Sequence, residues 1–178
     1  MNLVGKIEER LSLFSSLYDD IRIIDPFKKK IILSKSKDYE QSMGVCYKWW
    51  KRDEICKNCI SMRAFINKET FVKVEYNGGK ILLVTATPVT IDDQVYIAEL
   101  IKDISRNGGL FSKEEEDSCY VAQLINSMNE KTIKDKLTGI YNRKYINERL
   151  AMDLSYSKII NLSMSVIILE IPDFDSTI

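Results

Sequence analysis

Three runs rich in β-forming residues, between positions 70 and 104, constrain the fold more than any other part of the chain. They extend from Thr70 to Tyr76, from Lys80 to Thr87 and from Gln94 to Ile104. Asn77-Gly78-Gly79 separates the first two runs and supplies the positive φ angles that a tight hairpin needs, while Asp92-Asp93 marks the second reversal. The pattern predicts three consecutive antiparallel strands.

Two more strands and a helical region precede these runs. Ile21–Ile24 and Lys30–Leu33 flank a turn at Asp25-Pro26, which predicts a hairpin. Between about Tyr39 and Asn67 the helical pattern is broken, so we expect short helices and loops. Residues 2 to 18 carry the apolar stripe of an amphipathic helix, formed by Val4, Ile7, Leu11, Phe14 and Tyr18. The predicted fold class is α+β.

This order of helix, two strands, helical middle and three strands resembles that of PAS domains. The family has a five-stranded antiparallel sheet with a helical flank, and the stretch Glu99–Ile104 resembles the end of its last strand in bacterial sensors. The resemblance covers roughly Tyr18 to Ser105. It implies a sensor domain at residues 19–105, preceded by the amphipathic helix at residues 1–18.

Bulk composition excludes several classes of function. Lys+Arg and Asp+Glu balance at 26 each, so the net charge gives no reason to expect binding to nucleic acid or to an anionic membrane. The sequence shows no signal peptide and no apolar run long enough to span a bilayer, which predicts a cytoplasmic location. Because the chain has no histidine, Ser-His-Asp and Cys-His catalysis and histidine-ligated metals are excluded.

Residues 106–134 are predicted to form a signalling helix. Arg106–Gly109 ends the sheet as a hinge, and Ser112–Glu115 is a capping box. The helix then carries a second apolar stripe, formed by Val121, Ile125, Met128 and Thr132. Such a stripe can pack on its own sheet or pair with a second copy. Two stripes flanking one small domain favour a parallel homodimer held by the N-terminal and signalling helices.

The stretch Asp135–Tyr145 interrupts this helical pattern and then restarts it. The Thr138-Gly139 pair breaks the periodicity, since Gly139 permits a backbone turn that a side chain would resist. A new helix is expected from about Asn142. The stretch therefore predicts a unit of helix, wide turn and helix.

The residue string Asp-Lys-Leu-Thr-Gly-Ile-Tyr-Asn-Arg-Lys in this turn resembles the opening motif of GGDEF domains, the diguanylate cyclase family. That motif runs Asp-x-Leu-Thr-Gly-Leu-x-Asn-Arg-Arg and follows a signalling helix. The apolar run Ser165–Ile171 fits the first buried strand of the family's sheet. The resemblance implies that residues 135–178 are the N-terminal part of an α/β GGDEF domain. An intact domain uses Mg²⁺ to join two GTP molecules into cyclic di-GMP.

The sequence departs from the family at the metal-binding strand. The family strand ends Asp-x-Asp-x-Phe-Lys and reaches a guanine-reading Asn; the aligned residues here are Glu170, Pro172, Phe174, Asp175 and Ile178. Glu170 retains a carboxylate that can bind Mg²⁺, although its longer side chain moves the ligand. The sequence reaches Ile178 before the signature hairpin. We therefore expect no cyclase activity from this chain, and weak stability after about Lys134.

Three cysteines, Cys46, Cys56 and Cys59, have the spacing C-x9-C-x2-C within the proposed sensor domain. This stretch resembles a cysteine-bearing version seen in some PAS sensors of anaerobic bacteria. Three interpretations remain open: small buried side chains, redox thiols, or ligands of a soft metal or iron–sulfur group with Cys119 or a carboxylate as a further ligand. In each case we expect the three sulfurs to lie close together.

Two other features of the sensor domain have simpler interpretations. Trp49 and Trp50 are adjacent, so we expect one in the core and one at the surface. The run Lys28–Lys30 lies at a hairpin and is expected to be a solvated turn.

The leading functional hypothesis is a cytoplasmic sensor with a PAS input and a degenerate GGDEF output. One alternative is a non-catalytic regulatory or dimerisation module, and another is a cysteine-based redox or metal sensor. GTP is an expected partner only for a complete output domain.

Overall fold

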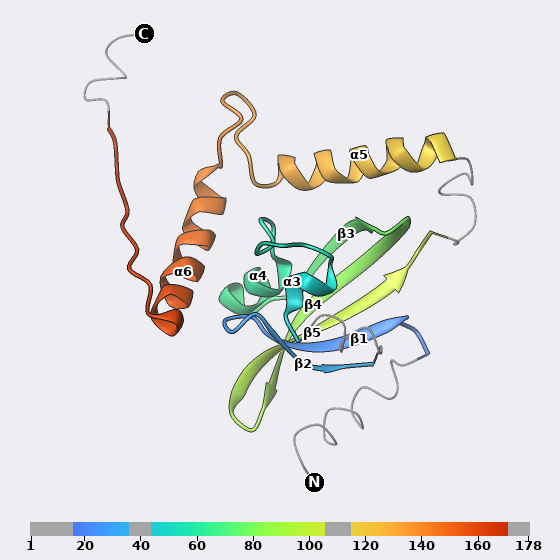
Figure 1. Ribbon diagram of the computed structural model, residues 1–178, viewed down its shortest axis with the longest axis horizontal. Coiled ribbons are helices and arrows are strands. Elements are labelled where there is room, and N and C mark those ends of the chain that lie inside the picture. The colour runs from blue at the N-terminus through green and yellow to red at the C-terminus, as the bar shows by residue number, and fades with distance from the viewer. Residues whose placement is uncertain (1–15, 36–43, 106–114, 171–178) are drawn as a thin grey trace.

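The computed structural model describes residues 16–35, 44–105 and 115–170 (Figure 1). Side chains are described in these ranges except at positions 115–119 and 159. The stripe of the predicted N-terminal helix, from Val4 to Phe14, lies outside the described residues. So do the hinge Arg106–Gly109 and most of the predicted capping box.

The core of the molecule is a five-stranded open sheet in which every pair of neighbours is antiparallel. Its order is β2-β1-β5-β4-β3, with bounds β1 Asp20–Asp25, β2 Lys30–Ser34, β3 Phe71–Asn77, β4 Lys80–Ile91 and β5 Gln94–Asp103. All five predicted strands are therefore confirmed, most within one or two residues. The fold is α+β, and a five-stranded antiparallel sheet with flanking helices is compatible with a PAS-like fold.

The hairpins form at the predicted turns. Gly78 and Gly79 both have positive φ, at 59° and 80°, between β3 and β4. Asp92 and Asp93 do the same between β4 and β5, at 47° and 62°. Two consecutive positive φ angles give a turn whose twist matches that of the flanking strands, so these dipeptides fix the register of the sheet.

Strand β4 is four residues longer than the sequence predicted. The prediction ended at Thr87, next to Pro88, but β4 pairs with β5 as far as Ile91. The pairing of β4 with β3 ends at Ala86. Pro88 thus lies beyond the end of β3. The N–H that proline lacks is therefore not needed for pairing with β3.

Four helices accompany the sheet in the described residues: α3 Cys46–Trp49, α4 Ile60–Asn67, α5 Glu115–Lys131 and α6 Arg143–Ile160. Helix α4 packs on β3, β4 and β5, α5 lies along β3, and α6 contacts α4 (Figure 1). The main apolar core lies under α4 and consists of Trp50, Ile60, Ala64, Leu82, Val84, Ala86, Ile97 and Ile101.

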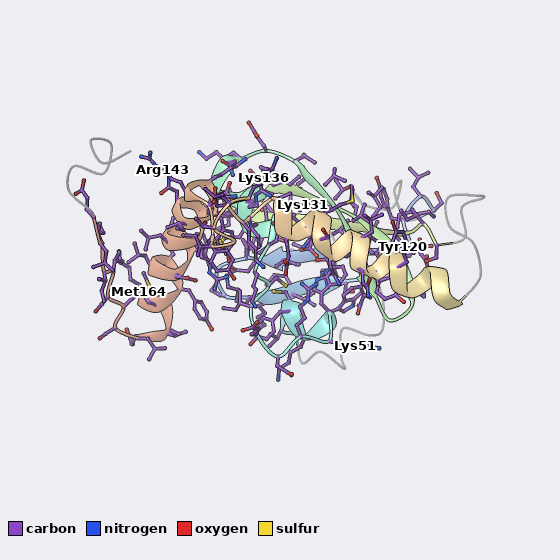
Figure 2. The ribbon with its side chains drawn as sticks, turned by 90° about the horizontal axis from the view of Figure 1, so that it is seen from above. Lys51, Tyr120, Lys131, Lys136, Arg143 and Met164 are labelled. Atoms are coloured by element: carbon purple, nitrogen blue, oxygen red, sulfur yellow. The ribbon has the colours of Figure 1, made fainter. Side chains whose placement is uncertain are left out.

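The apolar stripe predicted for α5 is divided between two environments. Ile125 is buried and α5 packs on β3, so part of the stripe contacts the chain's own sheet. Met128 is exposed, and it shares a four-residue spacing with two other exposed apolar residues, Tyr120 and Leu124. Figure 2 shows Tyr120 and Lys131 along α5, which lies over the strands. The predicted dimer is not tested by these contacts within one chain.

The strand predicted over Ser165–Ile171 does not form in the described residues. Residues 162–170 are extended but pair with no strand, and Leu169 is 92% exposed. Figure 2 places Met164 in this segment beside α6, away from the sheet. An apolar run becomes a buried strand only where a neighbouring strand satisfies its backbone. The described sheet is built from residues 20–103 and gives this segment no partner.

None of the helices that the structure describes has both the length and the apolar character that a membrane span requires.

Candidate functional site

A buried ion pair lies between the sheet and its helices. Arg22 on β1 is the cross-strand partner of Glu99 on β5, which places both side chains on the same face. Arg22 Nε donates to Glu99 Oε2 at 2.6 Å, and Ser61 Oγ in α4 donates to Glu99 Oε1. Arg22 is fully buried. Because a buried charge without its partner is costly, this pair fixes β1, β5 and α4 relative to one another.

The two tryptophans both pack on this arginine. The Arg22 guanidinium carbon lies 4.1 Å from the ring centroid of Trp49 and 4.9 Å from that of Trp50. Trp50 is buried and Trp49 is half-buried. Trp50 is thus the core tryptophan of the pair, and cation–π contact with Arg22 holds the half-buried ring of Trp49 in the flank.

The first cysteine of the C-x2-C pair lies beside a positive charge. Arg52 Nη1 donates to Cys56 Sγ at 3.1 Å, and Arg52 Nη2 donates to Glu75 Oε2 at 3.1 Å. Lys73 also pairs with Glu75, at 2.5 Å between Nζ and Oε1. The guanidinium is thus anchored to β3 and presents one donor to the sulfur.

The pKa values of the other two thiols are shifted mainly by burial. Burial raises the pKa of Cys46 far above its usual range, and the nearby Cys59 and Glu99 raise it further. Burial also raises the pKa of Cys59, with Cys56 adding to the effect and the Met62 amide opposing it. Cys46 and Cys59 are therefore thiols at neutral pH.

Electrostatic interactions connect the three cysteines, and the expected close approach of their sulfurs stays a prediction. Cys46 interacts electrostatically with both Cys56 and Cys59, and all three are free thiols. Cys56 and Cys59 line the same cavity of about 30 Å³, which is room for about one water.

A metal centre is not evident in this neighbourhood. Among the residues whose side chains the structure describes, no group of three Cys, Asp or Glu side chains is arranged to hold a metal ion. The side chain of Cys119, a predicted further ligand, lies outside the described ones. The described residues therefore do not by themselves fit the predicted soft metal or iron–sulfur group.

One lysine of the run at the β1–β2 hairpin is buried, which corrects the prediction of a solvated turn. Lys28 is exposed, but Lys29 Nζ donates to the Pro26 carbonyl at 2.8 Å and lies 5.5 Å from the ring centroid of Tyr156 in α6. Burial lowers the pKa of Lys29, while Cys59 and Cys46 act in the opposite direction. Lys29 has a positive φ of 55°, which turns it inward, away from its neighbours.

A larger cavity of about 700 Å³ opens next to the C-x2-C loop. Its walls come from the loop, from β3, from the end of α5 and from the turn that follows. Cys56 and Arg52 line it on one side, and Asn129, Glu130 and Tyr141 line it on the other. Cys56 is thus the cysteine that both cavities reach.

The C-x2-C loop is hydrogen-bonded to α5. Asn58, which lies between the two cysteines and is buried, donates from Nδ2 to Thr132 Oγ1 at 3.0 Å and to the Asn129 carbonyl at 3.4 Å. Asn129 Nδ2 in turn donates to the Val74 carbonyl of β3 at 3.0 Å. Lys73 Nζ donates to the Asn58 carbonyl at 3.0 Å. The loop and β3 together hold the C-terminal end of α5.

The predicted turn after α5 is confirmed. Asp135 Oδ1 accepts hydrogen bonds from the Leu137 and Thr138 amides at 3.1 and 2.9 Å, and from Thr138 Oγ1 at 2.8 Å. Gly139 adopts a φ of 72°. Asn142 then caps α6 by accepting from the Tyr145 amide at 2.8 Å. Asp135, Thr138 and Asn142 of the motif therefore each have a structural role in this turn.

The apolar residues of the same motif, in contrast, face solvent. Leu137 is 93% exposed and Ile140 is 67% exposed. Further along, Glu170 lies exposed in the extended segment, and no group of acidic side chains in the described residues surrounds it. The described residues around Glu170 do not fit a Mg²⁺ site.

Sequence reasoning missed three residues of this region: Arg52, Asn58 and Lys29. Arg52 lies four positions before Cys56, and Asn58 lies inside the C-x2-C motif, so both were close to a recognised signal. Lys29 had no signal, because a lysine between two others in a turn is ordinarily solvated.

Comparisons with known proteins do not assign a family. No protein-family model matches the chain, and no curated protein matches it.

Proposed function

We propose that the chain is a signal-transduction module, in which the PAS-like sheet of residues 19–105 is the input and α5 carries its state to a GGDEF-like segment from residue 135 onward. The observation that carries this proposal is the double attachment of Thr132, just after α5. Its Oγ1 accepts from Asn58 of the C-x2-C loop at 3.0 Å, and its carbonyl accepts from Asn142 Nδ2 at 3.2 Å.

This attachment links the sensor to the start of α6 through one residue. Asn142 is also the N-cap of α6, and its Nδ2 lies 3.4 Å from the Lys134 carbonyl. A displacement of the C-x2-C loop therefore moves Thr132, whose carbonyl accepts a hydrogen bond from the N-cap residue Asn142. The sheet can stay folded while this change takes place. Transmission of this kind requires a contact that differs between two states, and we propose that the bonds from Asn58 to Thr132 and to the Asn129 carbonyl are that contact.

The output itself is proposed from resemblance. The string Asp135–Lys144 resembles the opening of GGDEF domains, which join two GTP molecules into cyclic di-GMP with Mg²⁺. A complete output domain of this kind would supply Mg²⁺ and GTP binding from its own strands. The residues described here contribute the signalling helix, the turn and the first helix, whose role is to position such a domain.

A chimera tests the transmission. Residues 1–142 are joined, at the shared motif, to the remainder of an active diguanylate cyclase, and cyclic di-GMP formation from GTP and Mg²⁺ is measured. Asn58→Ala and Thr132→Val should each change the rate severalfold. Asn67→Ala is the matched control, since the hydrogen bond that Asn67 Nδ2 donates stays within α4, to the Arg63 carbonyl. Equal rates in all four proteins would contradict the proposal.

A non-catalytic dimerisation module is the second candidate, and the exposed face of α5 favours it. Tyr120, Leu124 and Met128 follow one another at four-residue spacing and are exposed in the single chain. Such a face is removed from water by pairing with a second copy, as is the stripe from Val4 to Phe14 at the N-terminus. We therefore expect a parallel homodimer.

Light scattering tests the dimer. The double variant Leu124→Glu/Met128→Glu should shift the mass from dimer to monomer, and so should charged residues at Ile7 and Leu11. Asn126→Glu, an exposed position on another face of α5, is the control and should remain dimeric. A monomeric unmodified chain at tens of micromolar would rule out pairing by these helices.

A further inference from the structure

Cys56 is placed to react with a small oxidant. It lines the cavity of about 700 Å³, from which a small molecule can reach the sulfur. The Arg52 guanidinium donates to Cys56 Sγ at 3.1 Å and is itself held by Glu75. The sulfur therefore has a fixed hydrogen-bond donor beside it and an open approach from the cavity. Cys46, in contrast, lines neither this cavity nor the smaller one.

Cys59 is placed to complete a disulfide. It follows Cys56 by three residues, is the N-cap residue of α4, and lines the same 30 Å³ cavity as Cys56. Burial keeps Cys59 protonated, so it does not compete for the oxidant. The pair thus combines a thiol that both cavities reach with a second thiol at the spacing that permits a four-residue disulfide loop.

We propose that Cys56 and Cys59 are a reversible, peroxide-responsive dithiol whose oxidation releases the end of α5. The Cys56 thiolate attacks hydrogen peroxide, an S–O bond forms, the O–O bond breaks, and the hydroxide that leaves takes up a proton as water. The Cys59 thiol then attacks the sulfenic sulfur of Cys56, the S–S bond forms, and a second water leaves. Two thiols are oxidised and one peroxide is reduced to two waters. A dithiol reductant reverses the step by disulfide exchange.

The consequence for α5 follows from the position of Asn58. A disulfide requires particular Cα–Cα separations and torsion angles, so closure over Lys57 and Asn58 reshapes the loop. Asn58 is buried, and its amide supplies the bonds to Thr132 and to the Asn129 carbonyl. Oxidation therefore weakens the attachment of α5 to the loop. The claim that this oxidation is a signal rests on the proposed function, whereas the formation of the disulfide does not.

Peptide mapping of the full chain tests the chemistry. The reduced protein is treated with hydrogen peroxide, blocked with a thiol reagent and analysed by mass spectrometry without reduction. We expect a Cys56–Cys59 disulfide in the unmodified chain and in Cys46→Ser, the matched control. Cys59→Ser should trap a sulfenic acid at Cys56 that reacts with dimedone. A disulfide that includes Cys46, or a Cys56→Ser variant that consumes peroxide at the unmodified rate, would overturn the assignment.

The role of Arg52 has its own test. Arg52→Gln should lower the rate of Cys56 oxidation by about 10-fold or more, because the cationic donor to the sulfur is lost. Arg52→Lys should retain part of the rate. Circular dichroism checks that each variant is folded. An unchanged rate in a folded Arg52→Gln protein would contradict the activation of Cys56 by this guanidinium.

Hydrogen exchange tests the coupling to α5. Oxidation of the unmodified chain should raise amide exchange over residues 126–134, and dithiothreitol should restore it. Asn58→Ala should show raised exchange before oxidation and little further change after it. If the disulfide forms without any change over residues 126–134, the coupling is wrong. If no disulfide forms while Asn58→Ala still alters the chimera, the thiol inference fails and the proposed sensor function stands.

Discussion

The sheet of residues 20–103 and the segment of residues 120–170 reach their described structures by different means. The sheet buries its own apolar side chains under α4 and adds the fully buried pair of Arg22 and Glu99. The segment contacts the sheet through Ile125 and through the hydrogen bonds of Asn129, and it leaves Leu137 and Leu169 almost fully exposed. We therefore expect the first region to fold on its own and the second to depend on whatever covers its apolar residues.

The attachment of the segment is nevertheless specific. Arg63 in α4 pairs with Glu148 in α6 at 3.1 Å, and Tyr145 and Met152 of α6 are buried. These contacts lie at one side of the molecule, while Asn58 holds the end of α5. A few local contacts of this kind can be made and broken without loss of the sheet, which is the property that a regulatory segment requires.

The largest effect should come from breaking the buried pair in the sheet. Arg22→Met leaves Glu99 buried without its cation and should lower the free energy of unfolding by about 3–5 kcal/mol in denaturant titrations. The double variant Arg22→Met/Glu99→Leu should recover most of this loss, because both charges are then gone. Glu130→Gln, in the exposed pair with Lys134, should cause no measurable change. A loss below about 1 kcal/mol for Arg22→Met would mean that the pair does not stabilise the sheet.

A smaller and local effect should come from the cap of α6. Asn142→Ala removes the side-chain acceptor of the Tyr145 amide and should destabilise α6 by about 1 kcal/mol. Residue-resolved hydrogen exchange should show faster exchange over residues 143–150 with no change in β4 and β5. Asn142→Ser keeps a capping oxygen and should restore most of the protection. Faster exchange in the sheet as well would show that the two regions are not separable.

The smallest effect should be a pH dependence of the turn. Hydrogen bonds from the amide and hydroxyl of Thr138 hold the pKa of Asp135 below its usual value. Because the folded pKa is depressed, the stabilisation is present at neutral pH and is lost as the pH falls below about 4, through the lowered pKa. The Gly139 amide shift in NMR spectra should report this loss. Asp135→Asn should abolish that titration, and a titration that persists in Asp135→Asn would assign it to another group.

The sequence located the strands well because turn residues carry strong local information. Gly78-Gly79 and Asp92-Asp93 adopt the positive φ angles that their positions predicted, and the strands follow from where those turns end. Gly139 and Asn142 were recognised for the same reason. In each case a local backbone requirement selects the residue type, so the residue reveals the conformation.

The rest depended on contacts between distant residues. Arg22 and Glu99 are 77 positions apart, and only the strand register shows that they are partners. Asn58 meets Thr132 across a similar distance in sequence. The strand predicted at Ser165–Ile171 was wrong for a related reason. Its composition suits a strand, but a strand forms only beside a neighbouring strand, and composition does not show whether one is present. Lys29 was misplaced because its burial comes from α6.

Native-state hydrogen exchange of the whole chain tests the central difference between the two regions most directly. If the sheet is self-sufficient and the segment is conditionally docked, amides of Ile81–Asp103 should exchange at least about 100-fold more slowly than those of Arg143–Ile160, with residues 162–170 fastest of all. Limited proteolysis should cut in the same order. Equal protection in both regions would contradict this account and would show that the chain folds as one cooperative unit.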